Sequence, residues 1–67
     1  MFIVLEIQTN SAGETAIAPV KTFADESIAL QDFFQTVAYA VVSALQIHTV
    51  ILMTADGNII RKEVYRH

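Results

Sequence analysis

Three side chains that could take part in proton transfer lie in the C-terminal third of the chain, namely His48, Glu63 and Tyr65. A histidine beside a carboxylate and a phenol on one face of a sheet can transfer protons or bind a ligand. His48 and Tyr65 also fit an ordinary cross-strand pair whose rings pack at an interface. Because placement in a fold does not by itself make a site, we expect no intrinsic catalytic activity from these residues.

Other residues add further candidates for chemistry. Arg61 extends the candidate ligand-binding group, and Glu6 is expected to be either solvated or paired with Arg61. His48 and His67 could share a metal ion, but a terminal residue such as His67 is usually frayed, so no metal site is predicted. The sequence has no GxGxxG, GKS, GKT, CxxC or HExxH motif, which leaves nucleotide, thiol-redox and zinc-protease chemistry without support. No cofactor is predicted.

The composition indicates a single small domain that associates with another protein surface. A chain of 67 residues without cysteine has a marginal core and no disulfide framework to reinforce it. Hydrophobic residues make up 54% of the chain and charged residues only 16%, so some apolar surface should be exposed in a monomer. The net charge of −3 argues against binding to DNA or RNA. We predict one domain over residues 1–67 and a homo-oligomer, most simply a dimer.

A long amphipathic helix is predicted over Asp25–Gln46, and the other elements must be arranged around it. Apolar side chains recur there at intervals of three and four residues, whereas polar side chains fall on the opposite side. Asp25 can accept hydrogen bonds from the first turn, and Thr22 is an alternative cap. The residues predicted to face the core are Leu30, Phe33, Phe34, Val37, Val41, Ala44 and Leu45.

Two β-hairpins flank this helix in the predicted fold. One is joined through the turn residues 10–13 and the other through Asp56–Gly57. The predicted class is α+β, with the element order ββαββ, a four-stranded antiparallel sheet in the order 2-1-3-4, and the helix packed on one face. Pro19 lies in one edge strand, and charge on the other edge strand discourages further pairing. The four predicted strands are Phe2–Thr9, Glu14–Thr22, Ile47–Thr54 and Asn58–Arg66.

The register of the second hairpin divides its side chains between two faces of the sheet. With Asp56–Gly57 as a two-residue turn, Met53 lies opposite Ile60 and His48 opposite Tyr65. One helix of about 10 Å diameter cannot cover both faces of a sheet roughly 19 Å wide, so one face stays uncovered. We predict that the helix covers the face with Ile3, Leu5, Ile7, Thr49, Ile51 and Met53, and that the oligomer interface lies on the uncovered face, at Val4, Val50, Leu52 and Tyr65.

Four stretches of the chain resemble a group of short hypothetical proteins from bacterial and bacteriophage genomes. They are MFIVLEIQTN at the start, VSALQIHTVILMT in the middle, the DG turn, and EVYRH at the end. The resemblance spans nearly the whole chain. It implies a phage or prophage context, and it assigns no functional residue and no particular chemistry.

Two classes of function follow from these observations. The first, which we expect, is a small self-associating interaction or structural protein that can bind another protein through the uncovered sheet face. The second is a small-ligand binder or enzyme whose site forms at a subunit interface around His48, Glu63 and Tyr65. The run Met1–Ile7 lacks the basic start of a secretion signal, and the apolar run Val37–Leu45 is too short to span a bilayer, so we expect a soluble cytoplasmic protein.

Overall fold

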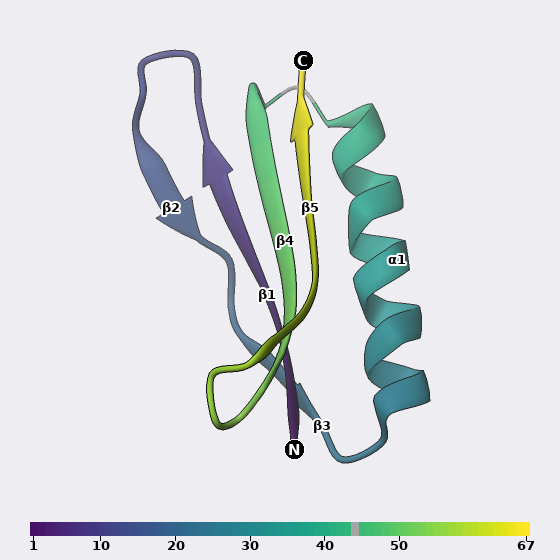
Figure 1. Ribbon diagram of the computed structural model, residues 1–67. Helices are drawn as coiled ribbons and strands as arrows, with labels where there is room; N and C mark the ends of the chain where they lie inside the picture. Colours follow the sequence, from purple (N-terminus) through teal and green to yellow (C-terminus); the bar gives the residue numbers. More distant parts are fainter. Residues whose placement is uncertain (44) are drawn as a thin grey trace.

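The chain folds into a helix packed on one face of an antiparallel β-sheet (Figure 1). The structure is a computed structural model that describes residues 1–43 and 45–67. It confirms the predicted α+β class, although the sheet has five strands in place of four. The elements in chain order are β1 (Phe2–Thr9), β2 (Thr15–Ile17), β3 (Lys21–Phe23), α1 (Glu26–Val42), β4 (Ile47–Thr54) and β5 (Ile59–Arg66).

The strands of the sheet have the order β2-β1-β4-β5, and β3 also pairs with β1. This corresponds to the predicted order 2-1-3-4 except at one edge, where the predicted strand Glu14–Thr22 is divided into β2 and β3, which both pair with β1. The division falls at residues 18–20, where Pro19 has no amide proton to donate to a ladder. Ala18 N still donates to Glu6 O at 2.9 Å, after which the chain leaves β1 and returns to it as β3. This edge of the sheet is therefore interrupted.

β4 and β5 form the second predicted hairpin, and most of its predicted register is confirmed. From Ile47 to Leu52, every residue has the partner that the position of the turn predicts. The turn includes Gly57 with a φ of 96°, a conformation that glycine adopts without strain. Next to the turn the prediction is wrong, because Met53 pairs with Ile59 in place of Ile60. The extra residue makes a β-bulge, which the alternating pattern of the strand does not reveal.

α1 begins where the sequence predicts but ends earlier. Asp25 caps the first turn, and its Oδ1 accepts a hydrogen bond of 2.8 Å from a backbone amide there. Thr22, the alternative cap, lies within β3. The last helical residue is Val42, so the predicted end at Gln46 is wrong. Ala44, which the sequence predicts to face the core, lies outside the described residues.

The core lies between α1 and the face of the sheet that carries Val4, Val50 and Leu52. These three side chains are at most 3% exposed, and they pack with Ala29 and Phe33 of the helix. The predicted assignment of the two faces is therefore wrong, because the same three residues were expected on the uncovered face. Both faces carry apolar side chains at alternate positions. The hand of the crossover from β3 through α1 to β4 decides which face is covered, and alternation contains no information about hand.

The buried side of α1 differs in part from the predicted one. Phe33 is fully buried, and Leu30 and Val37 pack against the core as predicted. Phe34 and Val41, however, are 51% and 45% exposed, so their predicted place in the core is wrong. Relative to the predicted orientation, the helix is rotated about its own axis, so that Phe34 and Val41 lie outside its contact with the sheet.

Candidate functional site

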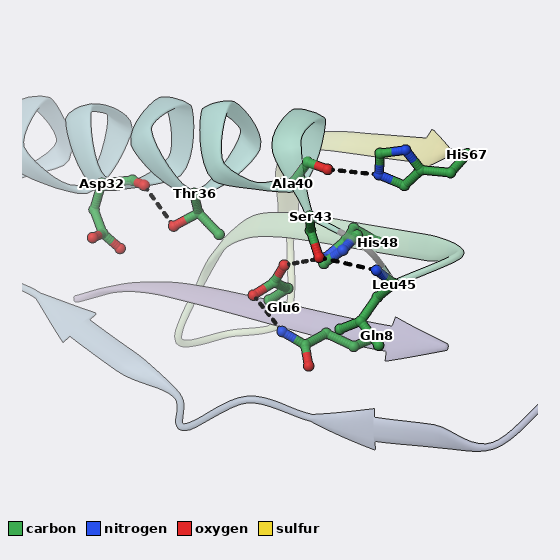
Figure 2. Close-up of polar contacts among 9 residues, drawn as sticks. All are labelled: Glu6, Gln8, Asp32, Thr36, Ala40, Ser43, Leu45, His48 and His67. Carbon is green, nitrogen blue, oxygen red and sulfur yellow. Dashed lines mark hydrogen bonds and ion pairs between the residues drawn. The ribbon is translucent and has the colours of Figure 1, made fainter. Parts of the chain in front are cut away.

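A contact between Glu6 and His48 places two ionisable side chains beneath α1 (Figure 2). Glu6 Oε2 lies 2.6 Å from His48 Nδ1, and the histidine is only 2% exposed. The other carboxylate oxygen of Glu6 accepts a hydrogen bond of 3.2 Å from Gln8 Nε2. Because Gln8 lies opposite His48 across the β1–β4 pair, Glu6 is a diagonal neighbour of the imidazole on the same face. The partner of Glu6 is thus His48, and the expected pairing with Arg61 is wrong.

The remaining ring nitrogen of His48 shows what this pair can do. A carboxylate at one nitrogen orients an imidazole for proton transfer at the other. Nε2 of His48 is buried, and no described side chain or backbone group forms a hydrogen bond with it. Acid–base catalysis needs a reacting group within hydrogen-bond reach of that atom. The contact with Glu6 therefore accounts for the position of the ring in the core, and it does not by itself assemble a reactive site.

The residues predicted to form a ligand-binding group do not converge on one point. His48 is buried, whereas Arg61, Glu63 and Tyr65 are exposed on β5. Tyr65 does lie opposite His48, as predicted. The guanidinium of Arg61 lies 5.3 Å from the centre of the Phe34 ring on α1. Glu63 forms no ion pair with any residue that the structure describes.

The C-terminal residue is anchored by the fold, which the sequence did not predict. His67 N donates to Gln46 O at 2.9 Å, and His67 Nε2 lies 3.0 Å from Ala40 O (Figure 2). Its ring packs edge to face against those of Tyr65 and His48, with centroids 4.9 Å and 6.3 Å away. The two histidines are therefore neighbours. Within residues 1–43 and 45–67, no group of three or more His, Cys, Asp or Glu side chains is placed to hold a metal ion.

A shallow cavity of about 140 Å³ opens beside Glu6, where the chain passes from β2 to β3. It exists because the edge strand is interrupted there. Lys21, at its rim, is bound to Asp32 Oδ1 at 3.2 Å, and Thr36 donates to the backbone oxygen of Asp32 at 2.8 Å. The lining residues are Val4, Glu6, Ala18, Pro19, Lys21 and Thr36.

The face of the sheet that points away from α1 is apolar, and we call it the open face. Side chains alternate along a strand, so its members on β1 and β4 fall between the core residues. Leu5 lies opposite Ile51 at its centre. The charged residues of this face, within the described strands, are Lys62 and Arg66 on β5, and both are basic. Its apolar members are Ile3, Leu5, Ile7, Ile17, Ile47, Ile51, Met53, Ile59 and Val64.

No protein family, curated protein or solved structure matches this chain. In the described part of the chain, no helix is both long enough and apolar enough to cross a membrane. The surfaces of the molecule are therefore the guide to its function.

Proposed function

We propose that this chain is a small self-associating interaction protein, and that two copies pair through the edge of β5. The free edge is the observation that supports this most. All eight residues of β5 are exposed, and β5 has β4 as its partner on one side and no strand on the other within the described sheet. An uninterrupted edge strand presents backbone donors and acceptors to which a further strand can bind.

The opposite edge of the sheet is a much poorer template. β2 and β3 have three residues each, and Pro19 lies in the gap between them. Neither short strand offers a long ladder of hydrogen-bonding groups, and a proline cannot donate to one. A second copy therefore finds its best pairing surface along β5.

Charge favours one register for two β5 strands. In an antiparallel pair related by a two-fold axis, opposite residues lie on the same face of the sheet. With Lys62 at the axis, Arg61 lies opposite Glu63 of the second copy, and this pair occurs twice. Moving the axis to a neighbouring residue places either Glu63 opposite Glu63 or Arg61 opposite Arg61. The favoured register also places Ile60 opposite Val64, and both are exposed apolar side chains.

The charged pairs select the register more than they supply the affinity. An opposite-charge pair across two strands contributes about 0.2–1 kcal/mol, and the two Lys62 residues that meet at the axis oppose each other by a similar amount. From the sequence we expect the charge on β5 to discourage edge pairing. In this proposal the charge disfavours only the other registers. We expect a weak, reversible dimer because an edge contact buries little surface.

Charge-reversal variants test this register. Arg61→Glu places two carboxylates opposite each other, and Glu63→Arg places two guanidinium groups opposite each other. We expect each variant to be monomeric when light scattering is measured at low salt over micromolar to millimolar concentrations. The double variant restores the pairing and is expected to have the mass of the parent dimer. An equimolar mixture of the two single variants is expected to form a heterodimer.

Two controls separate this contact from general damage to the fold. Lys62→Glu replaces two facing lysines with two facing carboxylates, so it is expected to keep the mass of the parent. Arg61→Glu also removes the contact with Phe34, but the double variant lacks that contact too, so recovery of the dimer cannot come from it. A parent protein that is monomeric throughout, or folded single variants that fail to combine, would contradict the proposal.

A further inference from the structure

We propose that the open face binds an amphipathic helix of a partner protein, and that this helix carries acidic residues along the flank beside β5. The surface is separate from the edge of β5. It is available whether or not two β5 strands pair, so this inference does not rest on the proposed dimer.

The sheet already accepts a helix on its other face, and the dimensions of the two faces are the same. α1 has 17 residues, and β1 and β4 beneath it have eight each. At rises of about 1.5 Å and 3.3 Å per residue, the helix and the strands are both roughly 26 Å long. The open face presents Leu5 and Ile51 from the same two central strands that contact α1. A second helix of similar length therefore fits across it.

The charges of the open face indicate the chemistry of the partner. Lys62 and Arg66 lie along its β5 side, and the described strands place no acidic side chain on this face, although the chain as a whole has a net charge of −3. A row of carboxylates on the partner helix would lie against these two basic residues. Two copies stacked with β5 over β5 would bring the basic residues together, which disfavours that arrangement.

The size of the open face agrees with a weak and reversible contact. Three strands of eight residues lie about 4.8 Å apart, and the short strands β2 and β3 share a fourth position beside β1, so the face is roughly 500 Å² and the contact falls at the lower end of specific interfaces. An anionic membrane is a less suitable occupant, because the net charge of −3 repels it over a longer range than two basic side chains attract it.

A matched pair of synthetic peptides tests the inference. Each has about 18 residues, an alanine-rich helical sequence and one leucine stripe, with either glutamates or lysines along one flank of the stripe. Fluorescence anisotropy of the labelled peptides measures binding to the full chain. We expect the glutamate peptide to bind about tenfold more tightly than the lysine peptide. The variant with both Lys62→Glu and Arg66→Glu is expected to reverse this preference.

Substitution of the apolar surface supplies the second part of the test. Ile51→Glu puts a carboxylate at the centre of the open face, where Lys62 lies opposite it and helps to keep the strand pair intact. We expect it to weaken both peptides by about tenfold or more. Val42→Glu makes the same kind of change on α1 at a residue that is 81% exposed, and it is expected to leave both affinities unchanged.

Several outcomes would overturn the inference. They are the absence of peptide binding, equal affinity for the two peptides, and an affinity that Ile51→Glu does not alter. Preferential binding of phosphatidylserine vesicles would identify the open face as a lipid surface, and a lower mass of Ile51→Glu alone would identify it as an interface between copies. Arg61→Glu, expected to be monomeric, should still bind the glutamate peptide as tightly as the parent, so failure of the edge pairing and failure of this inference are distinguishable.

Discussion

At the scale of single residues, the contact between Glu6 and His48 shows how two ionisable groups are kept in a small core. Burying either group without a partner costs free energy, because its hydrogen bonds to water are lost and not replaced. Here each group supplies the partner of the other at 2.6 Å, and Gln8 adds a donor to the carboxylate. Removing one member should therefore be worse than removing both.

A double-mutant cycle with leucine measures this dependence. We expect Glu6→Leu and His48→Leu each to lower the free energy of unfolding by about 1–3 kcal/mol, because each leaves the other polar group without its partner. The double variant is expected to lose clearly less than the sum of the two. Urea denaturation followed by circular dichroism gives all four values. Glu63→Leu is the matched control at an exposed residue of the same face, and little change is expected there when all variants are measured at a concentration at which the protein is monomeric. Additive losses would show that the two side chains act independently.

The partner of Glu6 could not be identified from the sequence for a geometric reason. It depends on the register of β1 against β4, and that register is not fixed by a short turn, because the helix and two strands lie between them. Once Gln8 is known to face His48, the diagonal position of Glu6 follows. Tyr65, by contrast, was correctly placed opposite His48, because the loop of this hairpin is short and the β-bulge beside it returns the strands to the predicted register.

At the scale of elements, the two adjacent phenylalanines of α1 show which side of the helix packs against the sheet. Phe33 is fully buried, whereas Phe34 is 51% exposed. We expect Phe33→Ala to lower the free energy of unfolding by about 3–5 kcal/mol, and Phe34→Ala by less than about 1 kcal/mol. Chemical denaturation of the two variants makes the comparison. Equal losses would mean that α1 is rotated about its axis relative to the structure described here.

The elements were more predictable than the way they pack. The cap at Asp25 and most of the β4–β5 register follow from local rules of turns and helix ends. The end of α1 does not, because the apolar pattern continues beyond Val42, whereas Ser43 Oγ accepts a hydrogen bond of 3.1 Å from Leu45 N that competes with the helical pattern. The covered face of the sheet also escaped prediction, since Leu5 and Ile51 on one face are as apolar as Val4 and Leu52 on the other.

At the scale of the whole molecule, strand order followed from connection rules, because a helix crossover joins strands that flank a central one. The abundance of apolar residues correctly indicated that some would remain at the surface, and Ile17, Phe34 and Val42 are more than half exposed. Composition carries no information about position, and the face with Val4, Val50 and Leu52, which was predicted to be uncovered, forms the core.

Self-association should make the stability of the whole molecule depend on its concentration. Because dimerisation stabilises the folded state by mass action, we expect the thermal midpoint of the parent to rise as the protein is concentrated. The Arg61→Glu variant, expected to be monomeric, should show a midpoint that is independent of concentration. Differential scanning calorimetry at several concentrations gives both series. A flat series for the parent would contradict self-association by any surface.

The gap around Pro19 has a consequence for the size of any assembly. If both edges of the sheet were long and regular, β5 of one copy could pair with the opposite edge of the next, and repetition of that head-to-tail contact would build a fibril without end. Three-residue strands on either side of a proline offer no such continuation. Growth by strand addition should therefore stop at two chains. Pro19→Val would make this edge more regular, and we expect that variant to be more prone to form amyloid than the parent.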